Sequence, residues 1–380
     1  MRHTCYVTYY EREKRRLLSD CLFPVVLHIH HRYGLKVNYL QRHWKYGPHV
    51  RIHVRTEEPE TWGQIRSYLE SAIRTYLKRY PSTSHLDREK YLEQSIRLGI
   101  EELDNGPYEP LRPDNSIVFE REAGNATVLG GAQQQTLKDE LMTLTMPSVY
   151  QLLVRTRDEK SRRNAYVLQL MCMFSNRLPE VGIRRGYLSF QSHLEEFLFQ
   201  FDRTGDIRTL FERKSQETVH EAAESIGSVL QSSKNGKYAG SDPVLQAWAV
   251  CLEKLWTRME SAAKSRIITE SADHLANVAG QVGEEAKRKW EFATREVSPF
   301  HHSLKKLNYL PERIHTESFS IYRWSVNLLY LLLPLAGITP MDRYYLCYLF
   351  TKAVEMRFGY SWEEIFSEYE QKSWGEDDEA

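Results

Sequence analysis

The first third of the chain alternates short runs of β-forming residues with segments of helical period. Thr4–Tyr10 predicts a strand, and Lys36–Trp44 and His49–Thr56 predict two more, joined by a tight loop over Lys45–Pro48. The spacing of apolar residues predicts helices over 12–33, 60–80 and 87–103, and a last strand follows over 117–121. This order of elements predicts an α+β fold that begins with a ferredoxin-like α/β sandwich.

Two residues predict where the first helix is interrupted and where it ends. Pro24 lies inside it and predicts a kink or a split, because proline has no backbone N–H to donate. Gly34 predicts the end of the helix, since glycine readily adopts the left-handed conformation that terminates helices.

The remainder of the chain has an almost purely helical pattern. Helices are predicted over 137–144, 148–175, 188–201, 219–231, 244–265, 273–294, 318–333, 341–358 and 362–370. We therefore expect residues 1–130 to form the α+β unit and residues 131–380 a large helical region that packs on it. Within that region we expect the C-terminal helices over 315–360 to complete the functional site.

Composition excludes several classes of protein. The 51 basic and 51 acidic side chains cancel, so a global basic excess typical of nucleic-acid binders is absent. Five scattered cysteines without a CxxC pair predict neither a zinc site nor a disulfide framework. The longest apolar run, over 326–338, is too short to span a bilayer, and the N-terminal residues lack the apolar stretch of a signal peptide. We therefore expect a cytoplasmic protein. No glycine-rich phosphate loop is present, and we expect no cofactor or metal.

Charge is nevertheless uneven along the chain. Residues 1–60 hold 11 Lys and Arg against 6 Asp and Glu, together with 7 of the 14 histidines. A local basic, histidine-rich region in a neutral protein favours binding of a small or local anion over wrapping of a polyanion.

The basic residues of this region are most regular on the third predicted strand. Alternation along a strand directs Val50, Ile52 and Val54 to one face, which we expect to be buried. The other face then presents a row of potential cations, formed by His49, Arg51, His53 and Arg55. Such a row is typical of a solvated outer sheet face. It also suits an anion pocket in which arginine holds a carboxylate and histidine moves protons.

Three segments carry a resemblance to a known family. They are WKYGPHVRIH at 44–53, PYEPLRPDNS at 107–116 and YRWSVNLLYLLLPLAGITPMDRYYLC at 322–347. Together they resemble the C-terminal, glutamate-eliminating domain of lantibiotic dehydratases and the standalone relatives of that domain in thiopeptide-type bacteriocin biosynthesis. The resemblance extends over residues 1–125 and 315–360, and it implies a lyase that tailors ribosomally made peptides.

In the implied reaction, a Ser or Thr esterified by glutamate loses its Cα proton and glutamate leaves from Cβ, which produces a dehydroamino acid. The reaction needs a base, donors for the developing enolate and cations for the leaving glutamate. The strand motif of the family reads HxRxR; His49 and Arg51 match it, and His53 stands in place of the second arginine. The late motif resembles HMxxNR; Asn327 matches it, and Arg323 stands in place of the histidine.

These departures suggest that arginine and histidine exchange roles within one pocket. His53 is then the base, and Arg51 and Arg323 hold the carboxylate, which predicts that these three residues converge in space. Tyr322, next to Arg323, completes the catalytic candidates. The substrate-binding candidates are His49, Arg55, Trp44, Tyr39, Asn327 and Arg112.

Two alternatives stay open. The resemblance also includes the thiopeptide pyridine synthases, which join two dehydroalanines by a formal [4+2] cycloaddition and expel water and the leader peptide. That reaction suits an aromatic groove, to which Tyr39, Trp44, Tyr322 and Trp324 can contribute. The other alternative is a non-catalytic partner that binds a leader peptide along an open strand edge.

The expected partners follow from the same resemblance. They are a leader-bearing precursor peptide and, for elimination, a separate glutamyl-tRNA-dependent dehydratase subunit that attaches the glutamate. A homodimer is also expected.

Overall fold

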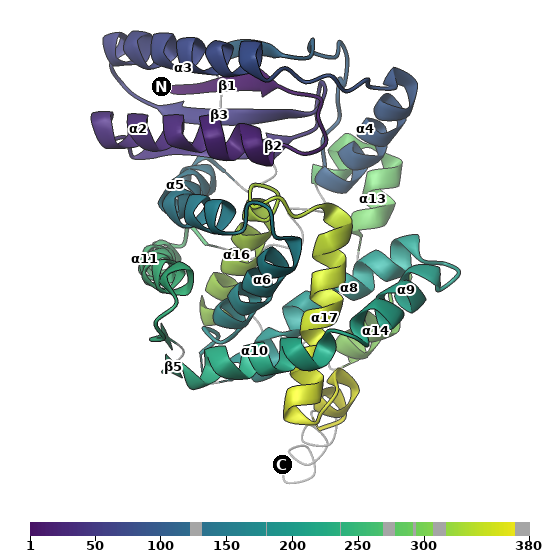
Figure 1. Ribbon diagram of the computed structural model, residues 1–380. Coiled ribbons are helices and arrows are strands. Elements are labelled where there is room, and N and C mark those ends of the chain that lie inside the picture. Colours follow the sequence, from purple (N-terminus) through teal and green to yellow (C-terminus); the bar gives the residue numbers. More distant parts are fainter. Residues whose placement is uncertain are drawn as a thin grey trace. The chain divides into compact units, whose positions relative to one another are not determined.

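The computed structural model describes residues 1–121, 131–179, 181–235, 237–268, 278–291, 294–306 and 317–368 (Figure 1). The chain divides into two compact units. Unit 1 comprises residues 1–157, 271–295 and 328–337, and unit 2 comprises residues 158–270, 296–327 and 338–380. The acidic C-terminal GEDDEA segment lies outside the described residues. No helix of the described ranges is long and apolar enough to cross a membrane.

Unit 1 contains a four-stranded sheet of β1 (Arg2–Thr8), β2 (Val37–His43), β3 (His49–Arg55) and β4 (Ser116–Arg121). Its spatial order is β2-β3-β1-β4, and every neighbouring pair is antiparallel. In chain order, helices separate β1 from β2 and β3 from β4, so β3 lies between two strands that a helix connects. This is the ferredoxin-like arrangement, and the predicted α+β fold is confirmed.

The helices of unit 1 lie in the segments where apolar residues recur with helical spacing. The first is interrupted: α1 (Arg15–Leu17) passes into a π-helical turn, η1 (Leu18–Leu22), and then into α2 (Phe23–Tyr33). Pro24 follows the π turn near the start of α2, so the helix changes its winding next to the proline instead of breaking. Gly34 ends α2 at φ 60°, as predicted.

Further helices of unit 1 follow the sheet hairpin in the sequence. α3 (Pro59–Arg79) and α4 (Arg88–Glu102) follow the hairpin of β2 and β3, and Asp87 caps α4 by accepting a hydrogen bond from the backbone N–H of Lys90. α13 (Glu284–Trp290) packs near α4 around Leu103. α5 (Ala132–Arg155) runs through Pro147, where the sequence pattern predicts a break, and ends instead at the turn that follows Arg155.

The two faces of the sheet have different chemistry. On one face Val50, Ile52 and Val54 are completely buried, as predicted. The ring of His3 on the same face stacks on Trp62 of α3 at 3.9 Å, and the amide of Asn38 donates to the carbonyl oxygen of Val26 in α2. This face is therefore the core of the sandwich, and the opposite face carries the polar side chains.

Unit 2 is built from helices. Five of them match the predicted ranges to within one residue: α8 (Leu188–Phe201), α10 (Val219–Gln231), α11 (Pro243–Lys264), α16 (Glu317–Leu332), whose first part lies in unit 2, and α17 (Pro340–Phe358). Unit 2 also contains α6 (Lys160–Ser175) and a helix over 362–368, which lie inside predicted helical ranges. The helices α7 (Ile183–Gly186), α9 (Asp206–Ser215) and α14 (Pro299–Lys306) were not predicted from the sequence pattern. Between α10 and α11 the predicted loop contains the short strands β5 (Ser233–Lys234) and β6 (Lys237–Tyr238).

The buried face of the sheet predicts the stability of unit 1. Replacement of Ile52 by Ala removes a fully buried side chain from β3 and leaves a cavity, so we expect the free energy of unfolding to fall by about 2–5 kcal/mol. Ile96→Ala, at an α4 position that is 53% exposed, is the matched control and should change stability by less than about 0.5 kcal/mol. Urea unfolding of both variants measures this, and equal losses would show that Ile52 is not part of the core.

Candidate functional site

The candidate site is the polar face of the sheet in unit 1. Strand pairing places Thr4 and Tyr39 directly opposite His53, so the three side chains share this face. The Oγ1 atom of Thr4 lies 3.0 Å from Nδ1 of His53, and the Tyr39 ring stacks on the His53 ring at 4.6 Å. The Tyr39 hydroxyl donates to Asp139 of α5 at 2.8 Å. His53 is therefore held between β1 and β2, next to the Tyr39 hydroxyl and the Asp139 carboxylate of α5 to which that hydroxyl donates.

Burial determines the charge of His53. The residue is 1% exposed. This burial, followed by the charges of Arg2 and Arg51, holds the pKa of His53 well below its usual value. The imidazole is consequently neutral, and the position contributes no cation to the row predicted from the sequence.

His49 is a second neutral histidine, and its tautomer follows from its contacts. It is completely buried, and this burial together with the charge of Arg51 lowers its pKa to about 3. Nδ1 of His49 lies 2.8 Å from the carbonyl oxygen of Gly47, which can only accept, so Nδ1 carries the hydrogen. Nε2 is then the acceptor, and Nε of Arg51 donates to it at 3.1 Å. His49 therefore orients Arg51 and acts as a positioning residue.

Two guanidinium groups lie over one aromatic ring on this face. Arg51 is 5.5 Å and Arg112 is 3.9 Å from the ring centre of Tyr6, which pairs with Arg51 across the β1–β3 ladder. The backbone of Arg112 is fixed on both sides, because its N–H donates to the carbonyl oxygen of Tyr46 and its carbonyl oxygen accepts from the Tyr10 hydroxyl. Arg112 also pairs with Glu120 at 2.7 Å. These guanidinium groups are permanent charges that can hold a carboxylate or polarise a carbonyl oxygen.

The other predicted residues of unit 1 lie around this centre. The Trp44 indole donates to Glu102 at 2.9 Å, and its ring lies 5.4 Å from that of His43 and 5.7 Å from that of Tyr108. Arg55 is exposed at the end of β3, 3.8 Å from Glu57. Trp44 thus borders the hairpin end of the polar face, whereas Arg55 lies at its other end.

Three predicted site residues belong to α16 in unit 2. Tyr322 is completely buried, and its hydroxyl donates to the carbonyl oxygen of Gly186. Arg323 and Asn327, one helical turn apart, lie on the exposed side of the helix. The convergence of Arg323 with Arg51 and His53 stays a prediction.

Several residues of the polar face were not predicted from the sequence. Tyr6, Thr4 and His43 could have been found, because alternation in β1 and the hairpin register place them on the face of Arg51 and His53. Asp139 could not have been found, since no local pattern in a helix reveals which strand it meets. Among the described residues, no group of three or more His, Cys, Asp or Glu side chains is arranged to hold a metal ion.

Comparison with known proteins agrees with this architecture. The family model described as "Lantibiotic biosynthesis dehydratase C-term" matches residues 3–354. The chain therefore belongs to that family, which confirms the resemblance seen in the sequence and places the chain among proteins that tailor ribosomally made peptides. No curated protein matches the sequence.

Two solved structures share the fold over nearly their whole length. The pyridine synthase TbtD from thiomuracin biosynthesis superposes with a TM-score of 0.73 at 22% identity, covering 94% of this chain and 99% of that one. TsrL superposes with a TM-score of 0.65 at 16% identity, covering 96% of this chain and 97% of that one.

The buried histidines predict how stability depends on pH. Both His49 and His53 are neutral when folded and titrate near pH 6.5 when unfolded, so the stability that depends on their neutral form is complete above that pH and falls as the pH drops below it. When the pH falls from 7 to 5, we expect each of these two histidines to lower the free energy of unfolding by about 2 kcal/mol. In urea titrations, His53→Gln should reduce this loss by about that amount, whereas the exposed His31→Gln should retain it. The same loss in both variants would contradict a neutral, buried His53.

Proposed function

We propose that this protein closes a six-membered nitrogen ring in a ribosomally made peptide by joining two dehydroalanine residues. The observation that carries the proposal is the charge of the polar sheet face. Of the predicted row of four cations, His49 and His53 are buried and neutral, and Arg55 lies at the exposed end. One oriented guanidinium, Arg51, remains at the centre of the row, which suits a neutral substrate better than a departing glutamate.

The proposed reaction requires donors that polarise an amide group of the substrate. It does not require cations that neutralise a leaving carboxylate. One dehydroalanine reacts through the iminol form of its amide bond as an azadiene, and the other supplies the double bond. Two carbon–carbon bonds form, the former amide oxygen leaves as water, and the leader peptide departs as an amide so that the ring becomes aromatic. Donors to the amide oxygen promote both the iminol form and the loss of water.

The residues of the polar face are assigned roles accordingly. Arg51 donates to the reacting amide oxygen, and His49 fixes the direction of its guanidinium through the 3.1 Å hydrogen bond. Arg112, whose guanidinium also lies over the Tyr6 ring, supplies a second set of donors. The neutral imidazole of His53 and the ring of Tyr39 are both buried, so they support the polar face from within and do not touch the substrate.

The structural neighbours support the proposal at the level of fold. TbtD is described as a pyridine synthase, and this chain matches almost all of it from end to end. The departures from the family motifs at His53 and Arg323 fit a reaction in which no glutamate has to be held.

Glutamate elimination is the second candidate, and one observation favours it. Arg51 and Arg112 both lie over the Tyr6 ring, an arrangement in which two guanidinium groups can share one carboxylate. A purely peptide-binding role needs an open strand edge, and the outer edge of β2 does not provide one. α5 covers the outer edge of β2, where the N–H groups of Asn38 and Leu40 donate to Thr143 and Met146.

One experiment separates the two reactions. The protein is incubated in parallel with a leader-bearing peptide that contains two dehydroalanines and with a peptide that carries a glutamylated serine, and the products are identified by mass spectrometry. We expect the first peptide to lose water and release its leader as an amide, and the second to remain unchanged. Loss of glutamic acid from the second peptide alone would establish elimination instead. No change in either peptide would refute both reactions.

The role of Arg51 leads to a quantitative prediction. Arg51→Ala removes the oriented donor, and we expect kcat to fall about 10²–10³-fold. His49→Ala should leave Arg51 in place but misdirected, and methylguanidine should restore activity to the Arg51→Ala variant but not to the His49→Ala variant. Arg74→Ala, at an exposed position of α3, is the control with unchanged kcat. Full activity of Arg51→Ala would show that Arg51 takes no part in the reaction and would contradict the role proposed for the polar face.

A further inference from the structure

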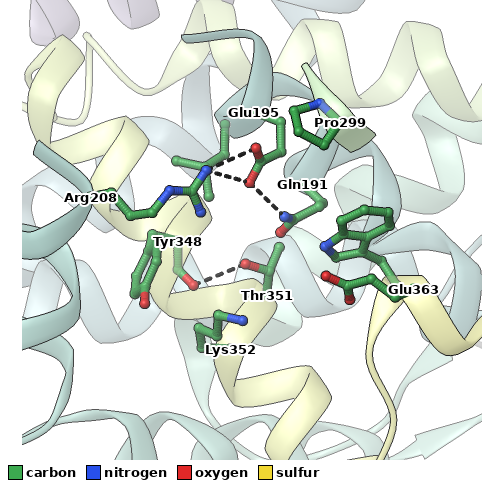
Figure 2. A pocket seen from close by; sticks show the side chains of 10 residues that line it. Gln191, Glu195, Arg208, Pro299, Tyr348, Thr351, Lys352 and Glu363 are labelled. Carbon is green, nitrogen blue, oxygen red and sulfur yellow. Dashed lines mark hydrogen bonds and ion pairs between the residues drawn. The ribbon is translucent and has the colours of Figure 1, made fainter. Parts of the chain in front are cut away.

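A separate pocket lies within unit 2, and none of its lining residues belongs to the polar sheet face of unit 1. It measures about 190 Å³, which is room for roughly six water molecules and therefore for one long side chain. α8, α9 and α17 contribute to it, together with the start of α14 and the helix over 362–368 (Figure 2). Its apolar wall includes Leu194, Pro299 and Trp362. The Trp362 indole is fixed from behind by the Phe300 ring, 5.2 Å away.

One buried polar atom in this pocket has no hydrogen bond. Gln191 is 4% exposed, and its Nε2 donates to Glu195 at 3.0 Å. Because Glu195 only accepts, the amide nitrogen must face it and the amide oxygen must face the other way. Figure 2 shows that oxygen on the side of Thr351, within the pocket. Oε1 of Gln191 has no hydrogen-bond partner, which marks a place for a donor from a ligand.

The charges around the pocket also favour a donor. Both lining cations are already paired: Arg208 donates two hydrogen bonds to Glu195 at 2.9 and 3.0 Å, and Lys352 pairs with Glu355 at 2.8 Å. Glu363 is an exposed lining residue that forms no ion pair within 4 Å with a described residue. Against the effect of burial, its charge helps that of Glu355 to raise the pKa of Lys352. An adjoining hollow of about 500 Å³ shares Tyr348 and Lys352 and adds Glu212 and Glu355. Carboxylates therefore outnumber cations around the two hollows, by Glu195, Glu212, Glu355 and Glu363 to Arg208 and Lys352.

We propose that this pocket binds the side chain of an arginine residue in the precursor peptide. A guanidinium can donate to Gln191 and Glu363 at once, because its N–H groups diverge in one plane. Its flat face can lie against the Trp362 indole, where a cation is attracted to the ring. The choice of the precursor peptide as occupant rests on the proposed function, whereas the preference for a guanidinium follows from the pocket itself.

Binding of short blocked peptides tests this inference without catalysis. Acetyl-Ala-Arg-Ala-amide is titrated into the full-length protein and followed by NMR, with the citrulline peptide as a neutral partner of the same shape and the norleucine peptide as an apolar one. We expect the arginine peptide to bind at least about fivefold more tightly than either. Equal binding of the arginine and citrulline peptides would overturn the inference.

Two variants locate the binding in this pocket. Glu363→Gln removes the exposed carboxylate, and Gln191→Met removes the buried acceptor with little change of volume; each should weaken binding of the arginine peptide at least about threefold. Glu221→Gln, at an exposed position of α10, is the matched control and should bind like the parent protein. Circular dichroism confirms that each variant is folded. Unchanged affinity in folded Glu363→Gln and Gln191→Met would exclude the pocket. Because the assay does not require turnover, selective arginine binding without ring formation would refute the proposed function and leave the site standing.

Discussion

The pairing of β3 with strands on both of its sides is the constraint on which this structure depends. Antiparallel register with β1 and β2 fixes which residues stand opposite His49, Arg51 and His53. A shift by one residue would bring the valines and isoleucine of β3 to the polar face and bury its charges in the sandwich core. The same hydrogen-bond ladder therefore sets both the apolar core and the composition of the candidate site.

Burial then changes the chemistry of that polar face. From the sequence alone, the two histidines and two arginines of β3 predict up to four positive charges on this face. In the folded chain, desolvation keeps His49 and His53 neutral, so His49 accepts a hydrogen bond from Arg51 and His53 stacks on Tyr39, while Arg51 carries the charge. Because fewer charges remain than the sequence indicates, we propose that the polar face activates a neutral amide and does not hold a leaving glutamate. The buried imidazole of His53 also cannot act as a permanent cation.

Much of the fold could be predicted from the sequence, and the reasons are local. Period-two and helical patterns identified the β2–β3 hairpin, the ferredoxin-like order and helices such as α3, which buries one face through Ile65, Leu69, Ile73 and Leu77. The π turn before Pro24 and the continuation of α5 through Pro147 escaped prediction, because a proline signals a lost hydrogen bond and not the way in which the helix adapts. The face of β3 could be predicted from alternation. Its burial could not, since it depends on contacts from α5 and from residues near 112, which are distant in the sequence.

The central claim is that His49 is a neutral imidazole that directs Arg51. Long-range ¹H–¹⁵N NMR spectra of the histidine side chains, with His49 assigned by its substitution, test this directly. We predict an Nδ1–H tautomer whose nitrogen shifts stay constant from pH 8 down to about pH 4, because burial lowers the pKa of His49 to about 3. Titration of His49 near pH 6.5, or a proton on Nε2, would contradict the account of the polar face and the role assigned to Arg51.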